Sequence, residues 1–122
     1  MTKDQFLNKY NPDKSLELSL QKSINASVQH NKLYIKNINS TLKENIKCVW
    51  KQKLKTLSND FEINPWDEKN HNHIIESLKV EMNKEFGELI KFKISHSQKS
   101  ISIYFKHLWC MEIISTPPQC PV

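Results

Sequence analysis

Arginine is absent from this chain of 122 residues, in which lysine supplies all eighteen basic side chains. Arginine provides the planar, bidentate contact with which proteins read guanine, so the sequence disfavours sequence-specific DNA recognition. Attraction to a phosphate backbone needs only positive charge, and the formal net charge of +5 leaves it open. Lys, Asn and Ile are abundant together, as AT-rich coding produces, so basicity alone does not establish a polyanionic partner.

Glycine, cysteine and long apolar runs are also scarce. With Gly87 as the single glycine, a fold of many strands would lack the residues that tight hairpins require. Three widely spaced cysteines do not form a disulfide framework, and no stretch approaches the roughly 18 apolar residues of a membrane span. The first ten residues contain no apolar leader segment. These absences predict a single cytoplasmic, all-α domain over residues 1–122, with no membrane association.

Helical periodicity and capping patterns predict where the helices lie. Thr2 and Gln5 form a capping box for a short first helix, and Asn11 followed by proline predicts the start of a second helix. Residues 15–29 also alternate like a strand, but the helical spacing is favoured. Two further helices are expected at about 42–57, capped by Thr41 and Glu44, and at about 72–86, with Asn72 as the N-cap.

The last helix, at about 96–114, is predicted to be the centre of the bundle. Its apolar residues follow the helical spacing, and others fall on the opposite face, so the helix is apolar nearly all round. A hairpin between 89–95 and 100–105 is the alternative. The helical pattern is more complete, and it leaves a minor two-stranded element near 33–38 or 89–94 as an option. The predicted fold is a small helical bundle around this helix.

The C-terminal histidine and cysteines raise the question of a metal site. His107 and Cys110 are three residues apart, so they share a helix face, and Cys120 could return as a third ligand. Structural zinc sites usually bring two ligand pairs, whereas here one pair would need a distant fourth ligand drawn from His71, His73 and His96. A core helix is therefore the preferred interpretation, with no cofactor and no metal. A zinc- or thiol-dependent enzyme using His107 and Cys110 stays as an alternative, although no enzyme motif is recognisable.

A row of lysines is the strongest functional signal. One stripe repeats every four residues along the helix at 42–57, and two more lysines precede it: Lys43, Lys47, Lys51, Lys55, Lys32 and Lys36. The stripe is predicted to lie opposite the apolar face, as an anion-binding surface. Residues 1–57 carry a balance of about +7 and residues 58–88 about −5, so mutual neutralisation of the two parts is an equally weighted alternative.

The stretch SHSQKSISIYFKHLWCM followed by PPQCPV resembles a C-terminal segment of uncharacterised bacterial proteins. The resemblance covers about a quarter of the chain and brings no known activity. It implies that Gln98, Lys99, Leu108, Trp109 and Cys120 belong to one packed unit. The segment commonly continues past its second Cys-Pro, which suggests a shortened or diverged member.

The leading hypothesis is a small, non-enzymatic binding protein of bacterial or phage type, in which the lysine face engages nucleic-acid backbone non-specifically or an acidic protein. The second hypothesis is a protein-interaction module, an inhibitor or accessory subunit, that uses exposed aromatic residues such as Trp66 and Tyr34 without nucleic-acid binding.

Overall fold

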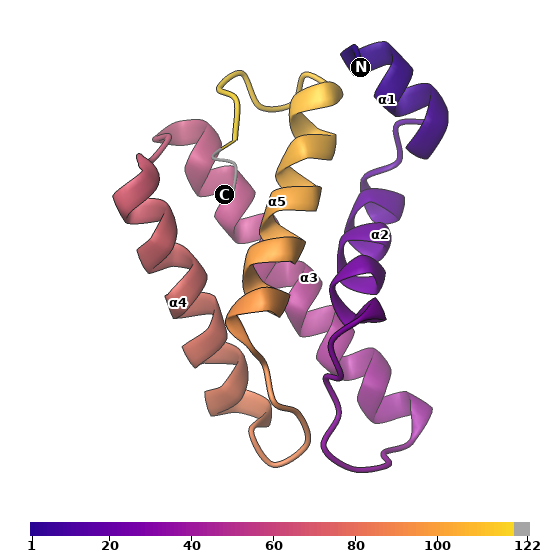
Figure 1. Ribbon diagram of the computed structural model, residues 1–122, viewed down its shortest axis with the longest axis vertical. Coiled ribbons are helices and arrows are strands. Elements are labelled where there is room, and N and C mark those ends of the chain that lie inside the picture. Colours follow the sequence, from indigo (N-terminus) through magenta and orange to yellow (C-terminus); the bar gives the residue numbers. More distant parts are fainter. Residues whose placement is uncertain (119–122) are drawn as a thin grey trace.

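The computed structural model describes residues 1–118 and shows an all-α fold. The helices run in the order α1 (Lys3–Tyr10), α2 (Leu16–Gln29), α3 (Ser40–Ile63), α4 (Glu68–Phe86) and α5 (Ile94–Cys110) (Figure 1). Within this part of the chain, none of the helices combines the length and the apolar content that crossing a membrane requires.

The helix starts follow local capping chemistry, although sequence patterns identified only one of them correctly. The capping box of Thr2 and Gln5 is confirmed. The other helices begin slightly earlier or later than predicted, with the caps Ser15, Asn39, Asp67 and Lys93. Asn11 is not an N-cap, because it ends α1 and its side-chain amide donates to the carbonyl of Ser15 and to Ser19 Oγ. Several Ser, Asn and Asp residues compete at each start, and packing decides among them.

Helix α3 extends further than the periodicity predicted. Residues 58–63 were expected to be connector, but they continue the helix and bury Ser58 and Phe61. Polar residues dominate this stretch, so its helical pattern is weak. The ring of Phe61 packs edge-on against Trp66, with 4.8 Å between ring centroids, and lies 5.3 Å from Phe105 of α5. These contacts hold the last turns of α3 on the core.

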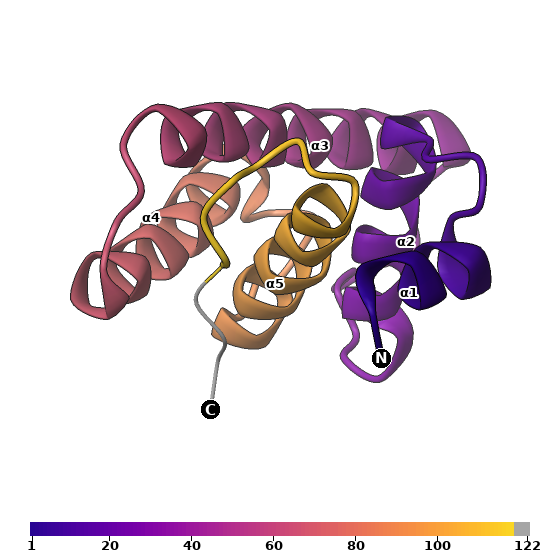
Figure 2. The same cartoon turned by 90° about the horizontal axis from the view of Figure 1, so that it is seen from above.

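Helix α5 is the centre of the bundle, as predicted, and contacts each of the other four helices. Both views place it between α2 and α4, with α3 crossing behind (Figures 1 and 2). Its observed bounds correct the prediction of about 96–114, because it begins two residues earlier and ends at Cys110 in a turn, well before Pro117. Four of its predicted inward residues, Ile101, Tyr104, Phe105 and Leu108, are at most 3% exposed.

The two stretches proposed for a minor sheet meet, but they form a single bridge instead of strands. Tyr34 and Ile90 pair in antiparallel fashion. The amide of Ile35 donates to Leu89 at 3.0 Å, and that of Lys91 donates to Leu33 at 2.8 Å. This bridge ties the α2–α3 connector to the α4–α5 connector, and so fixes the position of Lys32 and Lys36 relative to the bundle.

Candidate anion-binding surface

The lysine stripe lies on the flank of α3 and not opposite its apolar face, which corrects the prediction. Successive helix residues turn by about 100°, so Lys47 lies only about 60° from the buried Trp50. Lys43, Lys47 and Lys51 are accordingly half-buried, while Lys55 is exposed. The flank borders α2, with which α3 is in contact. The lysines therefore line the edge of the α2–α3 interface.

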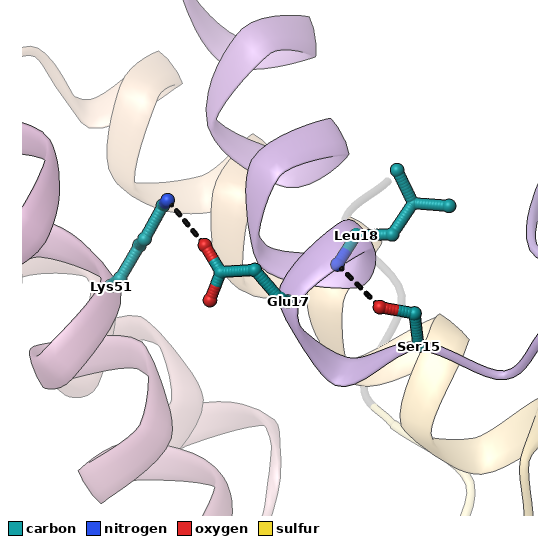
Figure 3. Close-up of polar contacts among 4 residues, drawn as sticks. All are labelled: Ser15, Glu17, Leu18 and Lys51. Carbon is teal, nitrogen blue, oxygen red and sulfur yellow. Dashed lines mark hydrogen bonds and ion pairs between the residues drawn. The ribbon is translucent and has the colours of Figure 1, made fainter.

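Lys51 is neutralised by an acid that no sequence pattern singled out. Its Nζ lies 2.6 Å from Glu17 Oε1, in the first turn of α2 (Figure 3). The hydrogen bond from Lys51 lowers the pKa of Glu17, and the charges of Lys51 and Lys55 act in the same direction. The two residues are 34 positions apart, so only the packing of α2 on α3 could reveal the pair.

Helix capping directs Glu17 toward α3. Ser15 Oγ accepts from the amide of Leu18 at 3.1 Å, which fixes the first turn of α2 (Figure 3). Glu17 then leaves that turn on the side that faces α3. An acid in the first turn is also favoured by the positive end of the helix dipole. Glu17 thus neutralises the positive charge of Lys51, in the middle of the stripe.

The N-terminal part of the stripe joins the connector through Tyr34. The ammonium of Lys43 lies 5.0 Å from the centre of the Tyr34 ring, a cation–π contact. Tyr34 is half-buried against the core, and burial raises its pKa. Lys32 and Lys36 are exposed on the same connector. The structure therefore brings the connector lysines to the first turns of α3, as a surface that continues the stripe.

Among residues 1–118, a single lysine forms ion pairs that join the basic and acidic parts of the sequence. Lys53 Nζ lies 3.7 Å from Glu81 and 3.9 Å from Glu85, both on α4. Lys53 of α3 is thus paired with two carboxylates of α4. Lys43, Lys47 and Lys55 form no ion pair within the described part of the chain. Neutralisation between the two parts is therefore limited to one lysine outside the stripe.

His107 and Cys110 occupy buried positions on α5 that suit packing. Cys110 is 5% exposed and packs with Phe6 and Leu7 of α1. Burial raises the pKa of its thiol, so the thiol stays protonated at neutral pH, whereas a nucleophile needs the thiolate. His107 is 2% exposed and meets the ring of Phe6 edge-on at 5.0 Å.

The other candidate zinc ligands do not gather with this pair. His96 is held between the amide of Lys93 and the carbonyl of Asn31. His71 Nδ1 accepts from Trp66 Nε1 at 3.1 Å. The described residues contain no group of three metal-ligating side chains, and Cys120 lies outside them. The geometry of residues 1–118 thus gives the metal alternative no assembled ligand set.

The aromatic residues proposed for protein recognition are less exposed than predicted. Trp66 is half-buried against Phe61 and Phe105, and Tyr34 is half-buried against the core. Hot-spot aromatics usually insert into a partner, so they must be free to leave their own surface. Both rings are instead part of the packing that holds the connectors in place.

Comparison of the chain with protein-family models, with curated proteins and with solved structures finds no match. The class that the fold and the surface define is a five-helix bundle, in the described residues, with a lysine-lined flank on its longest helix. Function must therefore be argued from that geometry.

Proposed function

We propose that this chain is a small, non-enzymatic binding protein that holds nucleic-acid backbone through the lysine flank of α3. The observation that carries the proposal is the uneven neutralisation of the stripe. Lys51 is paired with Glu17, while Lys43, Lys47 and Lys55 face solvent or ring surface without a carboxylate partner in residues 1–118. Lys32 and Lys36 extend the same positive surface.

The spacing of the lysines suits a repeating anion. Residues four apart on a helix are separated by about 6 Å along the axis, so the stripe presents regularly spaced positive charges. Lysine is a point charge without fork geometry, so this surface attracts phosphate without reading bases. Non-specific backbone binding by a cytoplasmic protein of bacterial or phage type is the function that we propose.

The first test is fluorescence anisotropy with a labelled duplex of about 20 base pairs in about 50–300 mM KCl, a range in which phosphate contacts are weakened strongly. We expect a triple variant, Lys43→Gln with Lys47→Gln and Lys55→Gln, to lower the salt slope by about 0.9 for each phosphate that is no longer neutralised. The matched control replaces the exposed Lys69, Lys84 and Lys91 with Gln, which removes the same charge elsewhere.

A second variant is expected to strengthen duplex binding instead of weakening it. Glu17→Gln frees Lys51, so we expect tighter binding and a salt slope that increases by about 0.9. Equal losses of affinity in the triple variant and its control would contradict the proposal. An absence of duplex binding at low salt, together with binding of polyglutamate, would favour an acidic protein as the partner.

A further inference from the structure

A cavity of about 670 Å³ lies between α1, α2 and α5, away from the lysine flank of α3. Its volume is within the range of pockets that bind small molecules. Aromatic and aliphatic side chains from all three helices line it: Phe6, Tyr10, Ala26 and Ile103. An apolar body of a small ligand would remove this surface from water.

Two lysines from different helices border the same cavity. Lys22 of α2 lies 5.7 Å from the centre of the Tyr10 ring, and its ammonium donates to the backbone carbonyl of Tyr10. Lys106 of α5 lies 4.9 Å from the centre of the Phe6 ring. Neither lysine is ion-paired in the described residues, and no carboxylate is among the described residues that line the cavity. The cavity therefore combines apolar walls with positive charge that no acid offsets.

His107 is a further polar group at the cavity, which Asn25 and Gln29 of α2 also line. His107 is 2% exposed, and Nδ1 of its ring is buried without a hydrogen-bond partner in the described part of the chain. Burial, with the charges of Lys22 and Lys106 added, lowers its pKa to about 4, so the ring is neutral at pH 7. Because buried N–H groups without an acceptor are rare, we assign the proton of the neutral ring to Nε2 and leave Nδ1 as the unpartnered acceptor. Nε2 is then the ring nitrogen that can donate to a ligand in the cavity, which His107 lines.

We propose that this cavity binds a small amphipathic carboxylate, with its apolar body against Phe6, Tyr10 and Ile103 and its carboxylate between Lys22, Lys106 and His107. Two ammonium groups and one imidazole N–H are three donor groups, and a carboxylate with four lone-pair sites can accept a hydrogen bond from each of them. The positive charges match a carboxylate and oppose a cation of the same shape.

Isothermal titration calorimetry with decanoate tests the proposal, and decyltrimethylammonium is the probe with the same chain and the opposite charge. We expect one decanoate per chain, bound at least about tenfold more tightly than the cation, which corresponds to about 1.4 kcal/mol. Amide chemical shifts of α1, α2 and α5 should move together in an NMR titration. Equal binding of the two probes, or no decanoate binding, would overturn the proposal.

Two variants localise the binding. Lys22→Gln with Lys106→Gln should weaken decanoate binding about tenfold, while Lys84→Gln with Lys91→Gln, of equal charge change, should leave it unchanged. Ala26→Leu fills the cavity from the surface of α2, so it should abolish binding with the circular dichroism spectrum preserved. Equal effects of the two lysine pairs would overturn the proposal. So would binding to anionic phosphatidylglycerol vesicles in the absence of any binding of free decanoate.

Discussion

The two halves of α5 differ in whether their buried polar side chains have hydrogen-bond partners. In the first half, His96 accepts from the amide of Lys93 at 3.0 Å and bonds the carbonyl of Asn31 at 2.9 Å. Ser97 donates to the carbonyl of Ile75 at 2.7 Å, and Ser100 accepts from Trp50 Nε1 at 3.1 Å. In the second half, Ser102 Oγ and His107 Nδ1 are buried without a partner among residues 1–118.

This difference separates structural polar groups from candidate binding groups. The bonds of the first half connect α5 to the α2–α3 connector, to α3 and to α4, so they fix how the bundle is assembled. A buried polar group without a partner costs free energy, and in a folded protein it calls for an explanation. His107 also lines the cavity, where the proposed carboxylate would accept from Nε2, while Nδ1 keeps no donor among residues 1–118.

The largest effect is expected from a substitution that removes the hydrogen bonds of His96, in the first half of α5. His96→Leu leaves the amide of Lys93 and the carbonyl of Asn31 without their partner, which we expect to lower the free energy of unfolding by about 1–3 kcal/mol for each group. His107→Leu removes an unpartnered nitrogen from an apolar setting, so we expect a change within about 1 kcal/mol. Urea denaturation measures the free energy of unfolding of both variants. Equal losses would contradict the proposed difference between the two halves of α5.

The second effect is acid sensitivity. Burial lowers the pKa of His71, His96 and His107, so at mildly acidic pH the unfolded chain binds protons that the folded chain does not. Stability should therefore fall as the pH drops below about 6.5, by up to about 1.4 kcal/mol per pH unit for each histidine. For His107 the loss continues to about pH 4, where the folded ring is protonated.

The variant His107→Leu isolates its share of this effect. We expect the variant to lose stability less steeply than the native chain between about pH 6.5 and 4, because one of the three differential protonations is gone and those of His71 and His96 remain. Denaturant midpoints across this range provide the measurement. Parallel curves for the two proteins would show that His107 titrates normally in the fold.

The smallest expected effect is a difference in stability between alanine variants of two serines of α5. Ser100→Ala leaves the indole N–H of the fully buried Trp50 without its acceptor, and we expect a loss of about 1–2 kcal/mol. Ser102→Ala removes a hydroxyl that has no partner and adds helix propensity, so the expected change is within about 0.5 kcal/mol and stabilising. Thermal unfolding of both variants tests the pair, and a costlier Ser102→Ala would contradict it.

Much of the helical architecture was predictable from local patterns. The spacing of Ile46, Trp50 and Leu54 identified the buried face of α3, and all three are fully buried. The apolar surface of the last helix identified α5 as central. Leu42, in the first turn of α3, continues the same helical spacing but is 38% exposed. Helix ends were predicted less well, since several capping residues lay within a few positions of each other.

The candidate site was predictable only as a set of lysines. Their spacing along one helix is a local property, but the flank on which they lie depends on which side of α3 meets α2. Charge compensation depends on it too, because Glu17 reaches Lys51 only where those two helices pack together. The cavity bordered by Lys22, Lys106 and His107 had no sequence signal, since its walls come from three helices.

The sequence by itself determined an all-α chain with a defined buried stripe on each long helix, because periodicity and capping act over a few residues. The tertiary structure decided which lysine is neutralised, which histidine is bonded at both ring nitrogens, and where the cavity lies. Those outcomes depend on contacts between residues far apart in the chain, such as the 65 positions between Asn31 and His96. Such contacts exist only after the helices have packed.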